Sequence, residues 1–522
     1  MKVGVPNEVH AGERRVAATP QSVKRLRKLG FEVQIERGAG ESADYPDANY
    51  VEAGATIVDD VEQLWATSDI VLKMCEPQQH PKLGVHEADL LREGGTLISF
   101  IWPAQNEELV KKLAARKATV FAVDCVPRIT RAQRMDALSA MANIAGYRAV
   151  VEAAHHYPRF FAGQVTAAGK IDPAKVLIVG AGVAGLSAIG AARGLGAQVR
   201  AFDSRKEVEE QITSMGAEFV ELEFEESGAG EGGYAKAMSE EFLKAEVALL
   251  AQHALQVDII ITTALIPGRP APELITAGMV ESMRHGSVIV DMAAQQGGNC
   301  TLTKPGQVVV HKGVTIIGYT DLPSRMAAQS SQLYATNLAH ILDELGGAEN
   351  FNVDYENEII RGALVLDQGQ MRWPPPQPKS PVPETIPTKR RDTAAPLVEQ
   401  PPAPEPKKLV NARWLWIALL GAIALGVGWY APESFLTHLT IFVLAIFVGW
   451  QVVWNVTPAL HTPLMSVTNA ISGIIIIGGM LQLTTGGFNA AMALGMIAVF
   501  IATLNIAGGF LVTKRMLAMF QR

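Results

Sequence analysis

At 522 residues the chain is too long for one compact core, so two or more domains are expected. Its net charge of −7 argues against nucleic acid as a partner, because nucleic-acid-binding domains carry a basic surface. The three cysteines lie far apart, with no C-x-x-C motif and no histidine at metal-ligand spacing, which predicts reduced thiols in a cytoplasmic compartment and no metal site.

Residues 1–372 are expected to form an α/β globular part. Short β-branched runs, such as 70–73 and 175–179, alternate with longer helical patterns such as 136–155. This alternation predicts parallel sheets covered by helices on both faces. No secretory signal is expected, because a strand pattern begins directly at Met1-Lys2-Val3.

The number of these units favours two Rossmann-like doubly wound subdomains. The first is expected from residues 1–145 plus about 330–372, and the second from residues 146–329. The cleft between the two subdomains is the expected ligand site.

A strongly polar loop follows the predicted strand at 119–123 and opens a helix of small residues. It reads Arg128-Ile129-Thr130-Arg131-Ala132-Gln133-Arg134-Met135-Asp136. One interpretation is a solvated helix start, in which Asp136 interacts favourably with the helix dipole. The other is a polar pocket that binds the phosphate, ribose or carboxamide of a ligand. The residues alone leave both open.

A dinucleotide-binding fingerprint follows the buried-strand run at 175–179. Gly180, Gly182 and Gly185 form a G-x-G-x-x-G motif between this strand and a helix that continues to Leu195. In this context the glycines allow a tight turn, close approach of a pyrophosphate and close contact between helix and strand. The helix N-terminus offers its free N–H groups to the phosphates. The motif therefore predicts a dinucleotide site that includes Val183.

An acidic residue stands at the expected distance after the fingerprint. Asp203 ends the next predicted strand, 198–202, and would accept hydrogen bonds from the adenosine ribose while repelling a 2′-phosphate. This favours NAD(H) over NADP(H). The adjoining Ser204 and Arg205 are expected to contact the cofactor as well.

Two later segments are candidates for further contacts with the nucleotide. Residues 223–242 are acidic and Gly-rich and carry Tyr234 beside Gly233, as in a flexible lid; an exposed insertion without a role is the alternative. Residues 262–268 follow another strand, and loops at carboxyl strand ends are where open sheets bind ligands. Leu265 is therefore expected near the ring or ribose.

A Pro-rich linker, 373–410, separates this part from an apolar region, 411–522. Twelve prolines between 374 and 406 favour an extended chain, either a passive spacer or a site for a Pro-recognising module. Four apolar runs then follow, each near or above the length that spans a bilayer, and they predict an α-helical transmembrane bundle. The runs are 414–430, 435–454, 464–483 and 488–512.

Charge and small residues predict how this bundle is arranged. Lysines and arginines flank the first and last runs, which places both termini and the soluble part in the cytoplasm. Glycines such as Gly479 and Gly495 suit close helix packing. Polar Asn505 could line water or form a hydrogen bond between helices, and the second interpretation is favoured.

In this order of motifs the chain resembles the alpha subunits of the proton-translocating NAD(P) transhydrogenases along essentially its full length. The resemblance rests on the polar loop, Asn143-Ile144-Ala145-Gly146, the Gly180 fingerprint, Gly232-Gly233-Tyr234, residues 262–268 and the four apolar runs. It implies that Arg128, Gln133 and Asp136, with the adjoining Ile129 and Thr130, hold the dihydronicotinamide end of NAD(H).

The resemblance also implies the partners. Hydride would pass between NADH on this chain and NADP bound by a membrane-embedded beta subunit, coupled to proton movement across the inner membrane of a bacterium. Paired, homodimeric NAD domains are implied as well. The lipid bilayer completes the expected surroundings of the chain.

Alanine dehydrogenase is the main rival, because it resembles residues 1 to about 345. Arg15 matches the carboxylate-binding arginine of that family, but Cys75, Trp102 and Gln295 stand where its catalytic lysine, histidine and aspartate are expected. A thiol, an indole and an amide cannot supply the proton acceptor that amino-acid oxidation needs. A third hypothesis is a silent NAD-sensing module tethered to a membrane.

Overall fold

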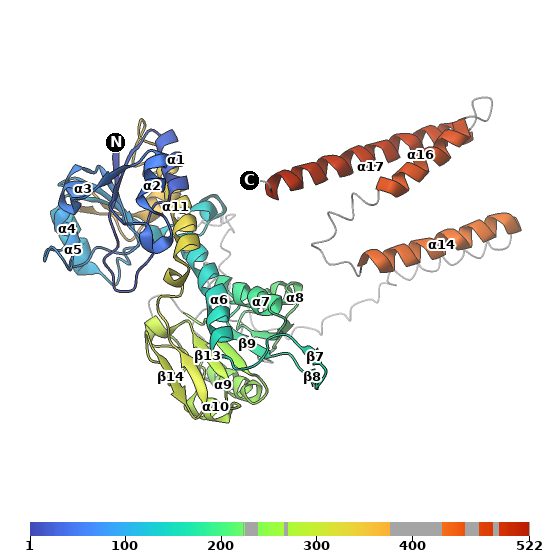
Figure 1. Cartoon of the computed structure of the whole chain (residues 1–522), viewed down its shortest axis with the longest axis horizontal. Helices are drawn as coiled ribbons and strands as arrows, with labels where there is room; N and C mark the ends of the chain where they lie inside the picture. The colour runs from blue at the N-terminus through green and yellow to red at the C-terminus, as the bar shows by residue number, and fades with distance from the viewer. Residues whose placement is uncertain are drawn as a thin grey trace, which may run out of the picture. The chain divides into compact units, whose positions relative to one another are not determined.

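The computed structural model describes residues 1–222, 224, 239–265, 270–375, 431–454, 469–483 and 490–520 (Figure 1). The chain divides into two units, Met1–Thr385 and Ile386–Arg522. Some predicted features lie outside the described residues, namely Gly233 and Tyr234 of the expected lid, residues 266–268, the Pro-rich linker beyond Pro375, and the apolar run 414–430.

The first unit contains an eight-stranded sheet in the order β17-β16-β6-β5-β4-β1-β2-β3, parallel from β6 to β3. The strands are β1 (Lys2–Val5), β2 (Glu32–Glu36), β3 (Thr56–Val58), β4 (Ile70–Leu72), β5 (Thr96–Ser99), β6 (Thr119–Ala122), β16 (Leu364–Asp367) and β17 (Gln370–Met371). All residues of β4, β5 and β6 are buried, as expected for strands covered on both faces.

Helices cover both faces of this sheet (Figure 1). On one face lie α3 (Val61–Thr67), α4 (Glu87–Leu90) and α5 (Glu107–Ala115), and on the other lie α1 (Pro20–Lys28), α2 (Asp47–Ala53), α11 (Ala327–Glu344) and α12 (Glu358–Ala363). The doubly wound arrangement that the strand and helix patterns predicted is therefore confirmed for this part of the chain.

A second, seven-stranded sheet has the order β11-β10-β9-β12-β13-β15-β14. Its strands are β9 (Lys175–Val179), β10 (Gln198–Phe202), β11 (Glu218–Phe219), β12 (Ile259–Thr262), β13 (Val288–Asp291), β14 (Val308–His311) and β15 (Val314–Ile317). One face is covered by α7 (Val183–Gly194) and α8 (Glu209–Ser214), and the other by α9 (Glu240–Ala254) and α10 (Ala277–Ser282). A short hairpin, β7 (Gln164–Thr166) and β8 (Gly169–Ile171), stands apart.

Each sheet also carries antiparallel edge strands that the sequence reasoning did not specify. β14 pairs with β15 through Lys312-Gly313, and β16 pairs with β17 through Gln368-Gly369. All four turn residues have positive φ, between 45° and 81°. Two-residue turns with positive φ at both positions match the right-handed twist of the strands, and glycine at the second position is typical of them.

The 20-residue helix α6 (Ala137–His156) joins the two subdomains. Its first half packs into the core of the first sheet through Met141 and Ile144, and its second half packs into that of the second sheet through Ala149 and Val150. A Cβ atom at Gly146 would lie 2.0 Å from the carbonyl oxygen of Ala184, so only glycine lets α6 approach α7 this closely.

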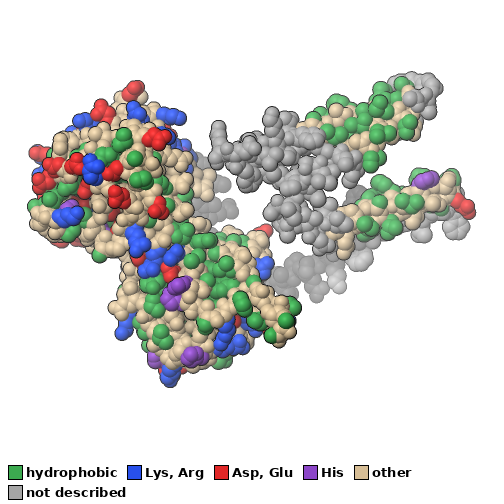
Figure 2. Space-filling view, in the orientation of Figure 1, with side chains coloured by type: hydrophobic (Ala, Val, Ile, Leu, Met, Phe, Trp, Pro, Cys, Tyr) green, Lys and Arg blue, Asp and Glu red, His purple; other side chains and the backbone are tan. Residues whose placement is uncertain are grey.

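The second unit contributes α14 (Glu433–Trp454), α16 (Asn469–Leu483) and α17 (Ala490–Phe520), whose described side chains are mostly hydrophobic (Figure 2). α14 is long and apolar enough to cross a bilayer, and shorter apolar stretches occupy Ser472–Leu483 and Met492–Gly508. These helices coincide with three of the four predicted runs, although α17 continues eight residues past 512. Lys514, Arg515, Met516 and Leu517 are strong helix formers, which accounts for the extension.

Small residues bring α16 and α17 together as the sequence predicted. A Cβ atom at Gly479 would lie 3.0 Å from the carbonyl oxygen of Gly495. Asn505 donates a hydrogen bond of 2.8 Å to Ser472 across the two helices. The interhelical interpretation of Gly479, Gly495 and Asn505 is therefore confirmed.

Candidate functional site

The glycine-rich turn joins β9 to α7, and each glycine has a distinct environment. Gly180 has a φ of 98°, and a Cβ atom there would lie 2.4 Å from Oγ1 of Thr263. A Cβ atom at Gly185 would lie 1.8 Å from the carbonyl oxygen of Gly180. The fold itself therefore requires the first and third glycines. A Cβ atom at Gly182 would meet no atom within 4 Å, so the fold leaves this position open.

The open position lies at the N-terminus of α7. Gly182 is the N-cap and supplies no side-chain hydrogen bond, so among the described residues the first N–H groups of the helix lack a side-chain partner. Val183, the first helical residue, is 42% exposed. Exposed N–H groups at a helix N-terminus bind anions, and open space at Gly182 lets a phosphate approach the backbone. These residues fit the pyrophosphate of a dinucleotide.

Asp203 links this turn to the loop that follows β10. Its carboxylate accepts a 2.7 Å hydrogen bond from the backbone N–H of Ala181 and hydrogen bonds of 2.9 Å from Nε and Nη2 of Arg205. The hydrogen bonds from Arg205 to Asp203 raise the pKa of that guanidinium above its ordinary value. Asp203, Ser204 and Arg205 thus lie beside the turn as expected, but the ion pair between the first and third of them was not foreseen.

The loop after β12 is also held beside the turn. Thr263 donates from its hydroxyl to the carbonyl oxygen of Gly180 at 3.1 Å. Fully buried Asn299 accepts from the N–H of Ala264 at 3.1 Å and donates to its carbonyl oxygen at 2.9 Å. These bonds fix the backbone just before Leu265, which is partly exposed. Asn299 was missed by the sequence reasoning, because no local motif marks it.

The polar loop folds into a short 3-10 helix, η3 (Thr130–Met135), that leads into α6. Asp136 is the N-cap of α6 and accepts hydrogen bonds from the N–H of Ser139 at 2.9 Å and from its hydroxyl at 2.6 Å. The contacts of Asp136 are therefore those of a helix N-cap, as the helix-start interpretation expected. Gln133 is exposed, and its side chain makes no hydrogen bond within the described residues.

Arg128, Ile129 and Thr130 precede this helix. Arg128 and Thr130 are exposed, and Ile129 is half-buried. Arg131 and Arg134 both form ion pairs with Glu344 at the end of α11. The loop therefore combines exposed side chains with two arginines that bind another helix.

α6 connects the polar loop to the glycine-rich turn. Ser187, in the first turns of α7, donates a 2.7 Å hydrogen bond to the carbonyl oxygen of Asn143 on α6. Asn143 is seven residues after Asp136, which corresponds to roughly 10 Å along the helix. The end of the polar loop is therefore a short distance along α6 from the helix that carries the turn.

A second polar cluster occupies the carboxyl end of β1 and β4. Arg15 donates to both carboxylate oxygens of Glu13, at 2.7 and 2.6 Å, and the thiol of Cys75 donates to Glu13 at 3.4 Å. Burial raises the pKa of Glu13, but hydrogen bonds and positive charge from Arg15 outweigh it and lower that pKa to about 2. Burial raises the pKa of the Cys75 thiol, so it stays protonated.

This cluster does not supply amino-acid dehydrogenase chemistry. Glu13 is ionised and already occupied by Arg15, and Cys75 holds its proton. Trp102 and Gln295 are exposed and carry no group that accepts a proton near neutral pH. Arg15 thus binds a carboxylate of its own chain.

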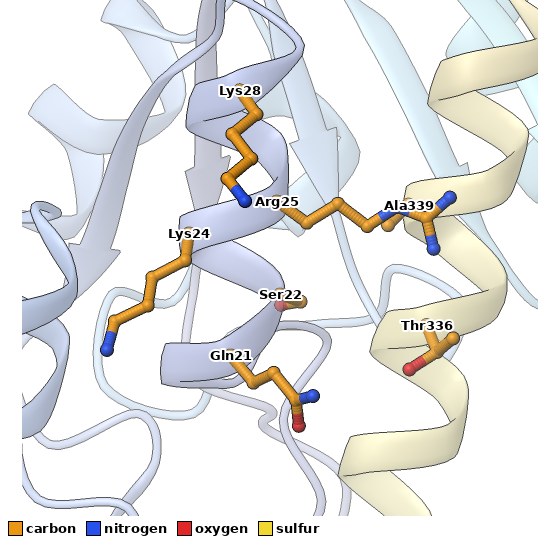
Figure 3. A pocket seen from close by; sticks show the side chains of 7 residues that line it. All are labelled: Gln21, Ser22, Lys24, Arg25, Lys28, Thr336 and Ala339. Atoms are coloured by element: carbon orange, nitrogen blue, oxygen red, sulfur yellow. The ribbon is translucent and has the colours of Figure 1, made fainter. Parts of the chain in front are cut away.

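A surface pocket lies away from these residues, between α1 and α11 (Figure 3). Figure 3 shows Arg25 reaching from α1 toward α11, whereas Lys28 extends along α1 and Lys24 points away from α11. The pocket contains none of the predicted site residues. Its lining consists of Gln21, Ser22, Lys24, Arg25, Lys28, Thr336 and Ala339.

Three family models match the chain. Residues 4–145 match the N-terminal domain of alanine dehydrogenase/PNT, and residues 149–374 match the C-terminal domain. Residues 438–522 match the 4TM region of pyridine nucleotide transhydrogenase. The matches therefore cover both the α/β part and the apolar part.

Individual relatives separate the two candidate families. The NAD(P) transhydrogenase subunit alpha of Cereibacter sphaeroides is 53% identical over 537 residues, with 100% of both chains covered. The crystal structure of a transhydrogenase from Sinorhizobium meliloti matches with a TM-score of 0.61 and 38% identity over 71% of this chain and 98% of that chain. Alanine dehydrogenase of Mycolicibacterium smegmatis is 32% identical over 57% of this chain and 74% of its own. Identity over the full length and the matched 4TM region show that the chain belongs to the family of NAD(P) transhydrogenase alpha subunits.

Proposed function

We propose that this chain binds NAD(H) through residues 1–375, here called the NAD domain, and exchanges hydride with NADP held by a partner subunit. The observation that carries the proposal is the glycine-rich turn. Its first and third glycines are required by the fold, whereas Gly182 leaves open the space above an uncapped helix N-terminus. This arrangement suits a pyrophosphate, and Asp203, which accepts a hydrogen bond from the N–H of Ala181 in the turn, is proposed to bind the adenosine ribose.

The carboxylate of Asp203 supports NAD(H) as the cofactor of this chain. A carboxylate accepts hydrogen bonds from the two ribose hydroxyls and repels a 2′-phosphate. Arg205 lies beside it, but its guanidinium is neutralised by the same carboxylate. The NADP(H) that the reaction requires is therefore assigned to the partner.

The polar loop is proposed to hold the nicotinamide end. Arg128 and Gln133 are exposed there, and Asp136 fixes the start of α6 through Ser139. Bound nicotinamide supplies the hydride chemistry, so the task of this chain is to position the ring within about 3–3.5 Å of its reaction partner and to exclude water. Leu265, in the loop after β12, is proposed to contact the ring or ribose.

The proposed partner and membrane location are supported by the family and by the charge distribution. The partner is a membrane-embedded beta subunit with an NADP(H) domain, and hydride transfer is coupled to proton movement across a bacterial inner membrane. Lysines and arginines on both sides of the apolar region support a cytoplasmic location for the NAD domain and both termini. A pair of NAD domains is proposed within the complex.

A matched pair of glycine variants tests the site. Gly182→Ala and Gly194→Ala each add a Cβ atom that meets nothing within 4 Å, but only Gly182 faces the proposed pyrophosphate position. Gly182→Ala is expected to weaken NADH binding at least ~10-fold, which corresponds to about 1.4 kcal/mol. It should also slow reduction of an NADP analogue by the assembled complex. Equal NADH affinities of the two variants would overturn the proposed site.

A further inference from the structure

Gln133 is placed by its neighbours rather than by contacts of its own. Its side chain is exposed and makes no hydrogen bond within the described part of the chain. Two nearby arginines of η3 extend to α11: Arg131, two residues before Gln133, and Arg134, directly after it. The position of Gln133 therefore depends on what holds these two arginines.

Glu344, the last residue of α11, holds both of them. Its carboxylate lies 3.3 Å from Nη2 of Arg131 and 3.1 Å from Nη2 of Arg134, and it accepts a 2.9 Å hydrogen bond from Asn357. The Glu344 side chain is only 13% exposed, whereas the arginines are 69% and 50% exposed. The hydrogen bond from Asn357, followed by that from Arg134, lowers the pKa of Glu344, so the carboxylate is ionised near neutral pH.

A second residue of α11 holds the backbone of the same loop. Asn337 donates a 2.9 Å hydrogen bond to the carbonyl oxygen of Arg134. Asn337 and Glu344 are seven residues apart, which is close to two turns, so both lie on one face of α11. The loop is therefore attached to α11 at two levels about 10 Å apart along its axis.

α11 itself is fixed to the first subdomain along its length. Ser331 accepts from the N–H of Val16 at 2.9 Å, and the buried Tyr334 donates to the carbonyl oxygen of Lys73 at 2.8 Å. Just before α11, Arg325 lies 3.4 Å from Glu152 of α6. α6 also contacts α7, the helix that carries the glycine-rich turn. Contacts of α11 with α6 therefore help to fix the position of the loop relative to that turn.

From these contacts we infer that Glu344 is a positioning residue for hydride transfer, acting through Arg131 and Arg134 to place Gln133. This inference rests on the proposed function of the polar loop. Two of the three arginines in that loop then serve the fold of the site rather than the ligand. Their acceptor lies more than 200 residues away in sequence.

The assembled complex of this chain with its partner subunit tests the inference. Glu344→Gln should slow single-turnover hydride transfer from NADH to an NADP analogue by roughly three- to tenfold, the loss expected when two part-exposed ion pairs no longer order the loop. The Kd for NADH should stay within about twofold, because the glycine-rich turn is untouched. Glu349→Gln, which removes an exposed carboxylate that forms no ion pair within the described residues, is the matched control.

A double variant separates positioning from an independent effect. If Glu344 acts through Gln133, Glu344→Gln combined with Gln133→Ala should be no slower than Gln133→Ala alone. The inference would be overturned if the rate losses of the two single variants multiply in the double variant. It would also be overturned if Glu344→Gln loses as much NADH affinity as it loses rate. If instead Gln133→Ala alone leaves the rate unchanged, the proposed function of the loop fails, whatever Glu344 does.

Discussion

Replacing Glu246 by glutamine is expected to stabilise the NAD domain above neutral pH. Glu246 is 6% exposed and lies on α9 between Phe242 and Leu250, which are one turn away on either side and also buried. Its carboxyl makes no hydrogen bond within the described residues. Burial, and then the charge of Asp203, raise its pKa from 4.5 to about 7.

The sign and size of the effect follow from this shift. In the unfolded chain the carboxyl of Glu246 ionises near pH 4.5. Between pH 4.5 and about 7 the folded protein therefore binds this proton more tightly than the unfolded chain does. The stability contributed by the neutral carboxyl is fully present below pH 4.5 and is lost as the pH rises through 7. A shift from 4.5 to about 7, at 1.36 kcal/mol per pH unit, corresponds to about 3 kcal/mol. Glutamine cannot ionise, so it avoids this loss.

Urea unfolding of residues 1–375 at several pH values measures the effect. This part contains its own buried hydrophobic clusters, which is the property expected of a part that folds alone. The free energy of unfolding of Glu246→Gln should exceed that of the native fragment by about 3 kcal/mol at pH 8 and by less than about 1 kcal/mol at pH 5. The control, Glu241→Gln, removes an exposed carboxylate of the same helix and should show no such trend. A difference between Glu246→Gln and native protein that stays constant from pH 5 to 8 would refute the reasoning.

Four other outcomes are expected. Asp203→Ala should weaken NADH binding roughly 10- to 100-fold, since hydrogen bonds to charged groups contribute about 1.5–3 kcal/mol, and should admit NADPH because Arg205 loses its carboxylate. Calorimetric titration checks both, and unchanged NADH affinity would contradict the assignment. Gln133→Ala should slow hydride transfer without lowering the melting temperature. Asp136→Ala should slow hydride transfer and also lower the melting temperature, because it removes an N-cap worth about 1 kcal/mol. Full single-turnover rates in both variants would show that the loop is purely structural. Residues 1–375 should produce no NADH from alanine and NAD⁺, and measurable production would revive the dehydrogenase hypothesis. The chain reconstituted alone in vesicles should neither transhydrogenate nor form a pH gradient. Its sequence has one dinucleotide fingerprint, and it has no Asp, Glu, Lys or Arg between 435 and 513. Either activity without a second polypeptide would show that the chain is sufficient.

The parts of the site that could be predicted from sequence are those encoded by neighbouring residues. The Gly180 fingerprint combines a strand, a turn and a helix within about 20 residues, so its chemistry is visible in one stretch of sequence. The N-cap at Asp136 is equally local, because its acceptor role involves only Ser139. The antiparallel hairpins at Lys312-Gly313 and Gln368-Gly369 were locally encoded too, and attention to the glycine in each turn would have found them.

The parts that could not be predicted depend on residues that meet only after folding. Asn299 holds Ala264 from 35 positions away, and Glu344 holds Arg131 from 213 positions away. Both are common polar residues with no motif around them, so their roles appear only when β12, β13 and α11 are placed. Charge pairing between Asp203 and Arg205 is short-range in sequence, but its geometry requires the backbone after β10 to turn back on itself.

The placement of α6 bears on how two subdomains would contribute to the proposed site. Hydride transfer requires reacting atoms at contact distance, so errors of about 1 Å between the two halves of the site are costly. A flexible connection at 137–156 would leave the polar loop and the glycine-rich turn free to move apart. Here a continuous helix starts at the loop, contacts α7 through Gly146 and enters both hydrophobic cores. Because packed helices resist sub-ångström displacement, the distance between the polar loop and the glycine-rich turn is set by the same contacts that stabilise the fold.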